Sequence, residues 1–272
     1  MPLRRSRGHR GRRLRLAPCA LGLLLAAACA TSPTGRTQIL AFDESRLDEM
    51  GDEAFGEMRS RMEVVRDGAR VDFVRCVARH VVDALPPDAE QDWEVAVFRE
   101  PSANAFALPG GHIGVHTGML DVTQGQDQLA TVIAHEVAHV LAEHPNERMS
   151  TQALAQAGVA AAGATTGTSD AVLAALGVGA QVGVVLPYAR AQETEADALG
   201  LDLMVRAGFD PRAAPALWRR MAQRDGGSPP ELLSTHPSDA TRIERLAEAA
   251  PEHVPAYRRA RAAGRTPDCQ TG

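Results

Sequence analysis

The sequence predicts one α+β domain that is mostly helical and contains a small mixed sheet. Several amphipathic patterns with helical spacing run along the 272 residues, whereas strand-like alternation is confined to residues 93–115. No internal repeat is evident. The residues after position 28 suffice for one sizeable core or two small ones, and we expect a single domain.

Residues 1–28 have the features of a signal peptide. Residues 1–15 carry seven Arg and no acidic residue, and residues 16–28 form an apolar run too short to span a bilayer. Small residues precede Cys29, as in the lipid-attachment sequence of bacterial lipoproteins. We therefore expect lipid at Cys29, with ordinary cleavage after an Ala as the alternative.

A lipid at Cys29 would anchor the chain to a membrane. In a two-membrane cell, Ala30 after the Cys favours the periplasmic face of the outer membrane; without lipid, the protein would be soluble in the periplasm or secreted. We expect residues 29–42 to form the lipid-anchored tether, residues 43–265 the domain and residues 266–272 a tail.

The charge of the chain argues against nucleic acid as a partner. The net charge is −5, and every basic residue is Arg. Loss of residues 1–28 would remove seven Arg and no acidic residue, so the remainder would carry −12. A phosphate backbone is repelled by such a surface.

The two remaining cysteines of the expected mature chain are Cys76 and Cys269. In an oxidising compartment they can pair and fasten an N-terminal helix to the C-terminal tail. The alternative is a buried thiol at Cys76 and a second thiol in a loose tail. The sequence does not distinguish between these two states.

Two helices and the sheet are expected in the first half of the domain. Amphipathic patterns predict helices over residues 43–65, with Ser45 as a possible cap, and over residues 69–85. Three alternating segments predict strands, and a Pro-Gly-Gly turn separates the last two. These strands cover residues 93–98, 102–108 and 112–115.

Helices dominate the second half. An apolar run predicts a buried helix over residues 128–144. Residues 153–186 are rich in Ala and Gly but contain no 18-residue apolar run, so we expect two buried or groove-lining helices and no membrane hairpin. The other predicted helices cover residues 187–207, 211–224 and 239–249.

The most informative pattern is H-E-x-x-H, formed by His135, Glu136 and His139 within the predicted buried helix. Residues four apart lie on one face of a helix, so the two imidazoles can bind one Zn²⁺. The intervening Glu can then act on a water bound to zinc. The alternative interpretation is a helix with two incidental His.

Glu193 is the best candidate for the third zinc ligand that hydrolases usually have. Asp197 lies four residues on, on the same face of the predicted helix, and would accept an N–H from His135 or His139 and fix its tautomer. Spacing alone is equally consistent with a solvated acidic helix face centred on Glu195.

Both motifs together resemble zinc metallopeptidase family forty-eight, which includes HtpX-type and CAAX-prenyl-protease-type enzymes. The pattern H-E-x-x-H followed by E-x-x-A-D is matched at residues 135–139 and 193–197. The resemblance is closest to LoiP-type and BepA-type lipoprotein peptidases, without the helical repeats of the latter or the membrane helices of the HtpX type. Further resembling segments are residues 29–38, 104–113 (an edge strand), 186–190 and 234–238 with Arg242.

The resemblance implies a zincin-like (gluzincin) metallopeptidase domain with one Zn²⁺ per chain, held by His135, His139 and Glu193. Glu136 would be the general base that takes a proton from the zinc-activated water.

The oxyanion that forms in such a reaction needs a further stabiliser, for which His236, Arg190 and Tyr188 are candidates. In BepA-type relatives the residue that matches His236 lies on a loop that can ligate zinc and keep the enzyme inactive. His236 is therefore expected to be a latch or an oxyanion stabiliser, with an ordinary surface His as the alternative.

The substrate would lie extended along an exposed sheet edge, which we expect at residues 112–115, where His112 and His116 either face the cleft or are ordinary strand-end residues. Main-chain binding reads little sequence and suits misfolded proteins. We thus expect a zinc endopeptidase of the bacterial envelope that degrades misfolded or stalled envelope proteins. The alternatives are a latent chaperone-like factor, closed by His236, that works with the outer-membrane assembly machinery, and a scaffold with structural zinc, which would need no Glu136.

Overall fold

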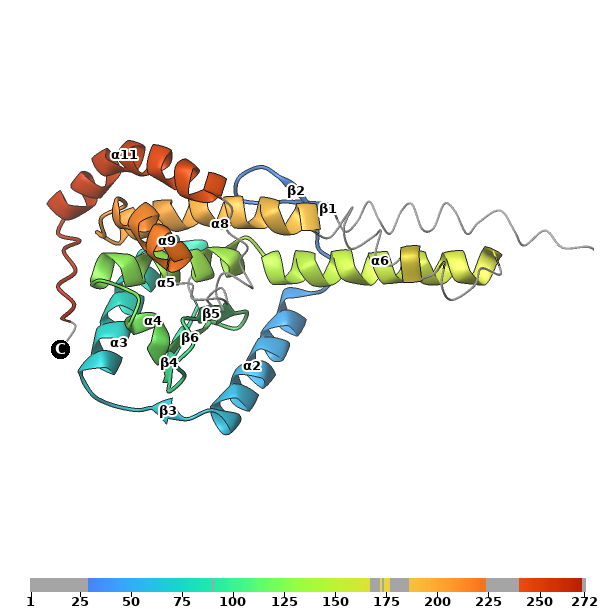
Figure 1. Ribbon diagram of the computed structural model, residues 1–272, viewed down its shortest axis with the longest axis horizontal. Coiled ribbons are helices and arrows are strands. Elements are labelled where there is room, and N and C mark those ends of the chain that lie inside the picture. The colour runs from blue at the N-terminus through green and yellow to red at the C-terminus, as the bar shows by residue number, and fades with distance from the viewer. Residues whose placement is uncertain are drawn as a thin grey trace, which may run out of the picture.

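The computed structural model describes residues 29–89, 91–166, 172, 174–176, 186–223 and 240–270. Within these residues the protein is mostly helical and has two small sheets, which confirms the predicted class. Figure 1 shows a helical body packed on one small sheet. One long helix, α6, projects from this body. The helices are α2 (Glu44–Arg61), α3 (Ala69–Val82), α4 (Thr117–Leu120), α5 (Gln126–Leu141), α6 (His144–Thr166), α8 (Leu186–Arg206), α9 (Ala213–Gln223) and α11 (Ala240–Ala262), with a 3-10 turn over Pro87–Ala89.

The larger sheet has the strand order β3-β4-β6-β5. Strand β6 pairs in parallel with β4 and antiparallel with β5, so the prediction that residues 112–115 form the edge is wrong. Gly110 and Gly111 adopt φ of 82° and 81° and fold β5 back on β6, which leaves β5 at the edge. The strands are β3 (Val64–Val65), β4 (Glu94–Phe98), β5 (Ala105–Leu108) and β6 (His112–His116).

The C-terminal ends of α2 and α11 differ from the prediction. Helix α2 ends at Arg61 because Val64 and Val65 pair with β4, where β-branched side chains are favoured; Asp43, not Ser45, occupies its N-cap position. Helix α11 continues to Ala262 through two prolines, since its apolar face packs against the core along this length. Tertiary packing thus overrides the local helix-stop signals.

The core is built around α5. This helix packs against α3, α8, α9 and β5, and twelve consecutive residues from Gln128 to His139 are buried. In Figure 1, α5 lies between α8 and the sheet. A helix buried on all sides places the H-E-x-x-H motif at the centre of the domain.

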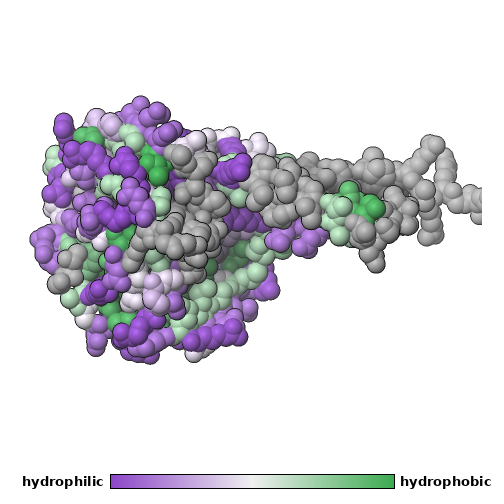
Figure 2. All heavy atoms as spheres, viewed as in Figure 1, coloured by the Kyte–Doolittle hydropathy of each residue, from purple (hydrophilic) through white to green (hydrophobic). Residues whose placement is uncertain are grey.

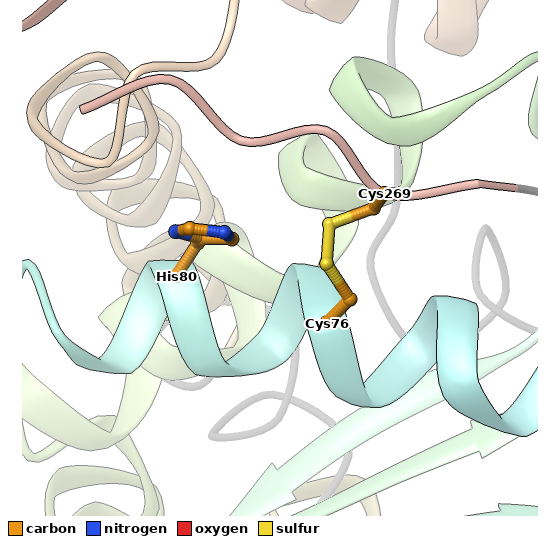
Figure 3. A group of neighbouring side chains, drawn as sticks. All are labelled: Cys76, His80 and Cys269. Atoms are coloured by element: carbon orange, nitrogen blue, oxygen red, sulfur yellow. A yellow bond between two sulfur atoms is a disulfide. The ribbon is translucent and has the colours of Figure 1, made fainter. Parts of the chain in front are cut away.

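Both ends of the described chain are fastened to the body. Cys269 in the C-terminal tail forms a disulfide with Cys76 on α3, so the pairing that the sequence allowed is present (Figure 3). At the other end, β1 (Cys29–Thr31) and β2 (Thr37–Ile39) form a hairpin, and the Ala41 amide donates to Ser150 on α6 at 2.8 Å. We expected a tether here, but the structure shows a segment docked on the domain.

Helix α6 leaves the body, and its residues from 152 to 164 are exposed or half-buried, so the first of the two buried or groove-lining helices expected over residues 153–186 is not buried. Residues 167–171, 173 and 177–185 lie outside the part that the structure describes. Leu154, Val172 and Leu176 are exposed, whereas the visible face of the body is mostly hydrophilic (Figure 2). Among the described helices, none is long and apolar enough to cross a membrane.

Candidate metal centre

Two packed helices bring the predicted metal ligands together. His135 and His139 lie one turn apart on α5, Glu193 lies on the neighbouring α8, and all three side chains are buried. Gly200 allows the close approach of the helices, because a Cβ at this position would lie 3.1 Å from the Cα of His135.

The donor groups of these three residues have separations that suit one tetrahedral ion. Nε2 of His135 lies 3.1 Å from Nε2 of His139, and these atoms lie 3.3 and 3.5 Å from the two carboxylate oxygens of Glu193. Donors bound tetrahedrally to zinc at the usual bond lengths lie about 3.3 Å apart. The residues therefore fit Zn²⁺ in donor type, number and spacing.

The charge around His135 favours a cation. Oδ1 of Asp197 lies 3.2 Å from Nδ1 of His135, and Nε2 of the same ring faces Glu193 at 3.3 Å. Burial and the nearby Arg242 lower the pKa of His135, but the carboxylates of Asp197 and Glu193 outweigh them and raise it to about 9. Positive charge is thus stabilised where the donors converge.

Arg242, on α11, belongs to the same centre. Its buried guanidinium donates to both oxygens of Asp197 at 2.7 and 2.8 Å and lies 3.6 Å from the centre of the Trp218 ring. Burial alone would raise the pKa of Asp197, but Arg242 and His135 lower it, so Asp197 stays ionised. In the sequence, Arg242 stands out only because it follows the segment over residues 234–238 that resembles the family. Its position beside the apolar Ile243 is the one further sign that this Arg could be buried.

The other predicted residues differ in their distance from the ligands. Glu136 is buried beside His135 on α5, whereas Arg190 is exposed on α8, and no described contact of its side chain reaches the ligands. His236 and the Tyr188 side chain lie outside the described residues.

The two histidines of strand β6 contact residues outside the sheet and are not part of the ligand group. His112 contacts Asp52 at 2.6 Å and stacks on Phe55 of α2, while His116 contacts Ser102 at 2.7 Å. The interpretation as strand-end residues therefore agrees with their contacts.

Sequence reasoning missed the partners beyond His139. Nδ1 of His139 lies 2.8 Å from Nδ1 of His144, whose Nε2 lies 3.1 Å from Glu195. Glu195 is buried, not the centre of a solvated face. Burial would raise its pKa, but hydrogen bonds, the largest from Ser32 and Thr34, lower it to about 2.

A second group of possible ligands is already used. Cys76 and His80 lie one turn apart on α3, and Cys269 approaches from the tail, but the two sulfurs form a disulfide (Figure 3). Among the described residues, the group formed by His135, His139 and Glu193 is therefore the one open to an ion.

A buried His-His-Glu centre on two packed helices defines a metallopeptidase domain. Residues 70–250 match the model of Peptidase family M48, and the chain belongs to this family.

Curated relatives include the mitochondrial metalloendopeptidase OMA1 of Schizosaccharomyces pombe, 39% identical over 182 residues, which are 66% of this chain and 53% of that protein. The metalloendopeptidase OMA1 of Homo sapiens is 30% identical over 236 residues, 80% of this chain and 45% of the relative. The beta-barrel assembly-enhancing protease of Yersinia pestis is 29% identical over 204 residues, 71% of this chain and 42% of the relative. The chain spans about half the length of these relatives.

Proposed function

We propose that this chain is a zinc-dependent endopeptidase of the gluzincin type, whose ion is held by His135, His139 and Glu193. The observation that carries the proposal is the set of donor separations, 3.1 to 3.5 Å, on two packed helices. Family membership and the names of the relatives support it. When bound, Zn²⁺ would supply Lewis acidity for a water molecule and for the peptide carbonyl.

The chain's own residues would then divide the remaining work. Glu136 would take a proton from the attacking water and pass it to the leaving amine. Asp197, held by Arg242, would accept Nδ1–H of His135 and so keep its Nε2 directed at the ion. His236 and Arg190 remain our candidates for stabilising the oxyanion.

The substrate would be an extended peptide on strand β5. In the larger sheet, β5 and β3 are the two edge strands and each pairs on one side only. Of these two, β5 packs against α5, which carries the motif. Main-chain hydrogen bonds along this edge would bind many sequences, as unfolded protein substrates require.

Activity and base are tested together by casein cleavage with the zinc-loaded full chain and its Glu136→Gln and His236→Ala variants. We expect Glu136→Gln to lose roughly 10²- to 10⁴-fold in rate while it keeps its zinc. A gain in rate by His236→Ala would support the latch. Absence of cleavage by all three proteins, with zinc bound, would contradict the peptidase proposal and favour the chaperone-like assembly factor.

We further propose that the protein is exported to the bacterial envelope, is lipidated at Cys29 on the periplasmic face of the outer membrane and acts on misfolded envelope proteins. Residues 1–28 and the exposed Cys29 support this proposal. Other relatives are named mitochondrial, so the domain also serves a second compartment.

Membrane fractionation and mass spectrometry in a bacterial host test the location. The chain should carry lipid at Cys29 and sediment with outer membrane, and Cys29→Ala should release it. A chain that keeps Cys29, carries no lipid and stays soluble would contradict the lipoprotein proposal.

A further inference from the structure

The ligand His139 starts a chain of hydrogen bonds that leads away from the metal centre and ends on the N-terminal hairpin, β1–β2. His144, at the start of α6, is fully buried between His139 and Glu195, at 2.8 and 3.1 Å. Glu195 then accepts from Thr34 Oγ1 at 2.6 Å and from Arg36 at 2.9 Å. Three regions far apart in the sequence, namely the hairpin, the junction of α5 and α6, and α8, thus meet in one polar network.

A break between α5 and α6 makes this contact possible. On a continuous helix, residues five apart point about 140° away from each other. Glu143 adopts a φ of 52°, in the left-handed region, and His144 begins a new helix. The imidazole of His144 therefore turns back to His139 instead of facing away from it.

The hydrogen-bond pattern fixes the proton positions. Glu195 is a carboxylate and only accepts, so His144 donates from Nε2. A neutral imidazole that donates from Nε2 accepts at Nδ1, and the 2.8 Å between Nδ1 of His144 and Nδ1 of His139 requires one donor and one acceptor. His139 must therefore donate from Nδ1, which leaves its Nε2 free of a proton and directed at Glu193. This is the tautomer that a metal ligand needs.

Arg36 holds the outer end of the network. Its guanidinium pairs with Glu147 on α6 at 2.7 Å and with Glu195 on α8 at 2.9 Å, and both carboxylates are buried. Loss of the cation would leave two buried negative charges short of a partner, which is costly. Arg36 thereby fixes α6 and α8 relative to each other beside the metal centre.

We propose that His144, Glu195 and Arg36 are positioning residues for His139, through which the docked N-terminal segment raises the affinity of the centre for zinc. They fix the tautomer and the ring orientation of His139 and touch neither substrate nor ion. This inference rests on the proposed function in one respect, namely that His139 binds the metal, and does not depend on proteolysis.

The test is the zinc affinity of the full chain, measured by competition with a chromophoric chelator, together with the visible spectrum of the Co²⁺-loaded protein. His144→Phe keeps an aromatic ring but removes donor and acceptor, and Glu195→Gln removes the charge that His144 faces. Each should weaken zinc binding roughly 10- to 100-fold and alter the Co²⁺ band, and Arg36→Ala should do so by about 10-fold. His144→Gln offers one donor and one acceptor and should restore part of the affinity.

Arg99→Ala is the matched control, because it breaks an exposed ion pair with Glu63 away from the ligands. Its affinity and spectrum should equal those of the wild type. Folded His144→Phe and Glu195→Gln variants with wild-type affinity and spectrum would overturn the proposal. If His144→Phe fails to fold, the near-isosteric Glu195→Gln decides. A wild-type chain that binds no zinc would instead overturn the proposed function.

Discussion

Two groups of side chains in this protein share one geometry and have different fates. Cys76 and His80 lie one turn apart on α3 and meet Cys269, just as His135 and His139 lie one turn apart on α5 and meet Glu193. In the first group the two cysteines form a disulfide that fastens the tail, whereas the second group has the spacing of a zinc centre. Helical spacing alone therefore does not decide whether ligand-type residues bind metal.

The surroundings account for the difference. The second group is buried and has outer partners: Asp197 for His135, and His144 for His139. These partners orient both rings so that Nε2 of each faces Glu193. In the first group both sulfurs are consumed by their bond, and His80 meets Phe209 edge-to-face, with ring centres 6.2 Å apart.

Removal of a ligand from each group should give the largest contrast. Glu193→Gln removes the charged donor of the second group, so we expect zinc affinity to fall by more than the roughly 10- to 100-fold that outer partners contribute. Cys76→Ser should leave zinc affinity and stoichiometry unchanged. Equal losses in both variants, by chelator competition, would break the comparison.

For the stability of the metal-free chain, the cysteine group should matter instead of the zinc ligands. Cys76→Ser opens a disulfide between residues 193 apart, so the free energy of unfolding should fall by roughly 2–5 kcal/mol. Denaturant unfolding of the metal-free chain measures this change, and Cys29→Ser is the control because Cys29 is exposed and outside the disulfide. A Cys76→Ser variant as stable as the wild type would show that the tail adds nothing.

Asp197→Asn sharpens the account of the outer partners. The amide keeps the size of the side chain but loses the charge shared by His135 and Arg242, so zinc affinity should fall by roughly 10- to 100-fold. Isothermal titration with Zn²⁺ and a competing ligand measures the loss. Unchanged affinity in a folded variant would mean that Asp197 only anchors Arg242.

The smallest effect is expected at the remaining member of the first group. His80→Gln removes an aromatic contact with Phe209, so the free energy of unfolding should fall by about 0.5–1.5 kcal/mol. Zinc stoichiometry should stay at one per chain. A lower stoichiometry, measured by elemental analysis, would show that His80 binds an ion after all.

The sequence was sufficient for the parts of the site that depend on spacing within a helix. The motif on α5 and the pair Glu193 and Asp197 on α8 follow from 3.6-residue periodicity and family resemblance. The role of His144 was hidden, because the pattern over residues 128–144 predicts one continuous helix, and only the left-handed Glu143 turns His144 back. Arg36 was hidden in a segment expected to be a tether.

The order of the strands in the larger sheet could not be predicted from the sequence, for a related reason. Alternation predicts where strands lie but not which strand is central. Strand β6 is central because it pairs in parallel with β4, and this pairing depends on the tertiary fold and not on local sequence. The disulfide likewise required the fold to bring Cys269 to α3. Long-range placement, not local propensity, separates what was predictable from what was not.

The most direct test of the zinc centre is X-ray absorption at the zinc edge of the oxidised, zinc-loaded full chain. We predict one zinc with only nitrogen and oxygen neighbours at about 2.0–2.1 Å, two of them imidazoles, and the loss of this signal in Glu193→Gln. Sulfur neighbours at about 2.3 Å, or no bound zinc, would contradict the account, because the ion would then belong to the cysteine group or to no site in this protein.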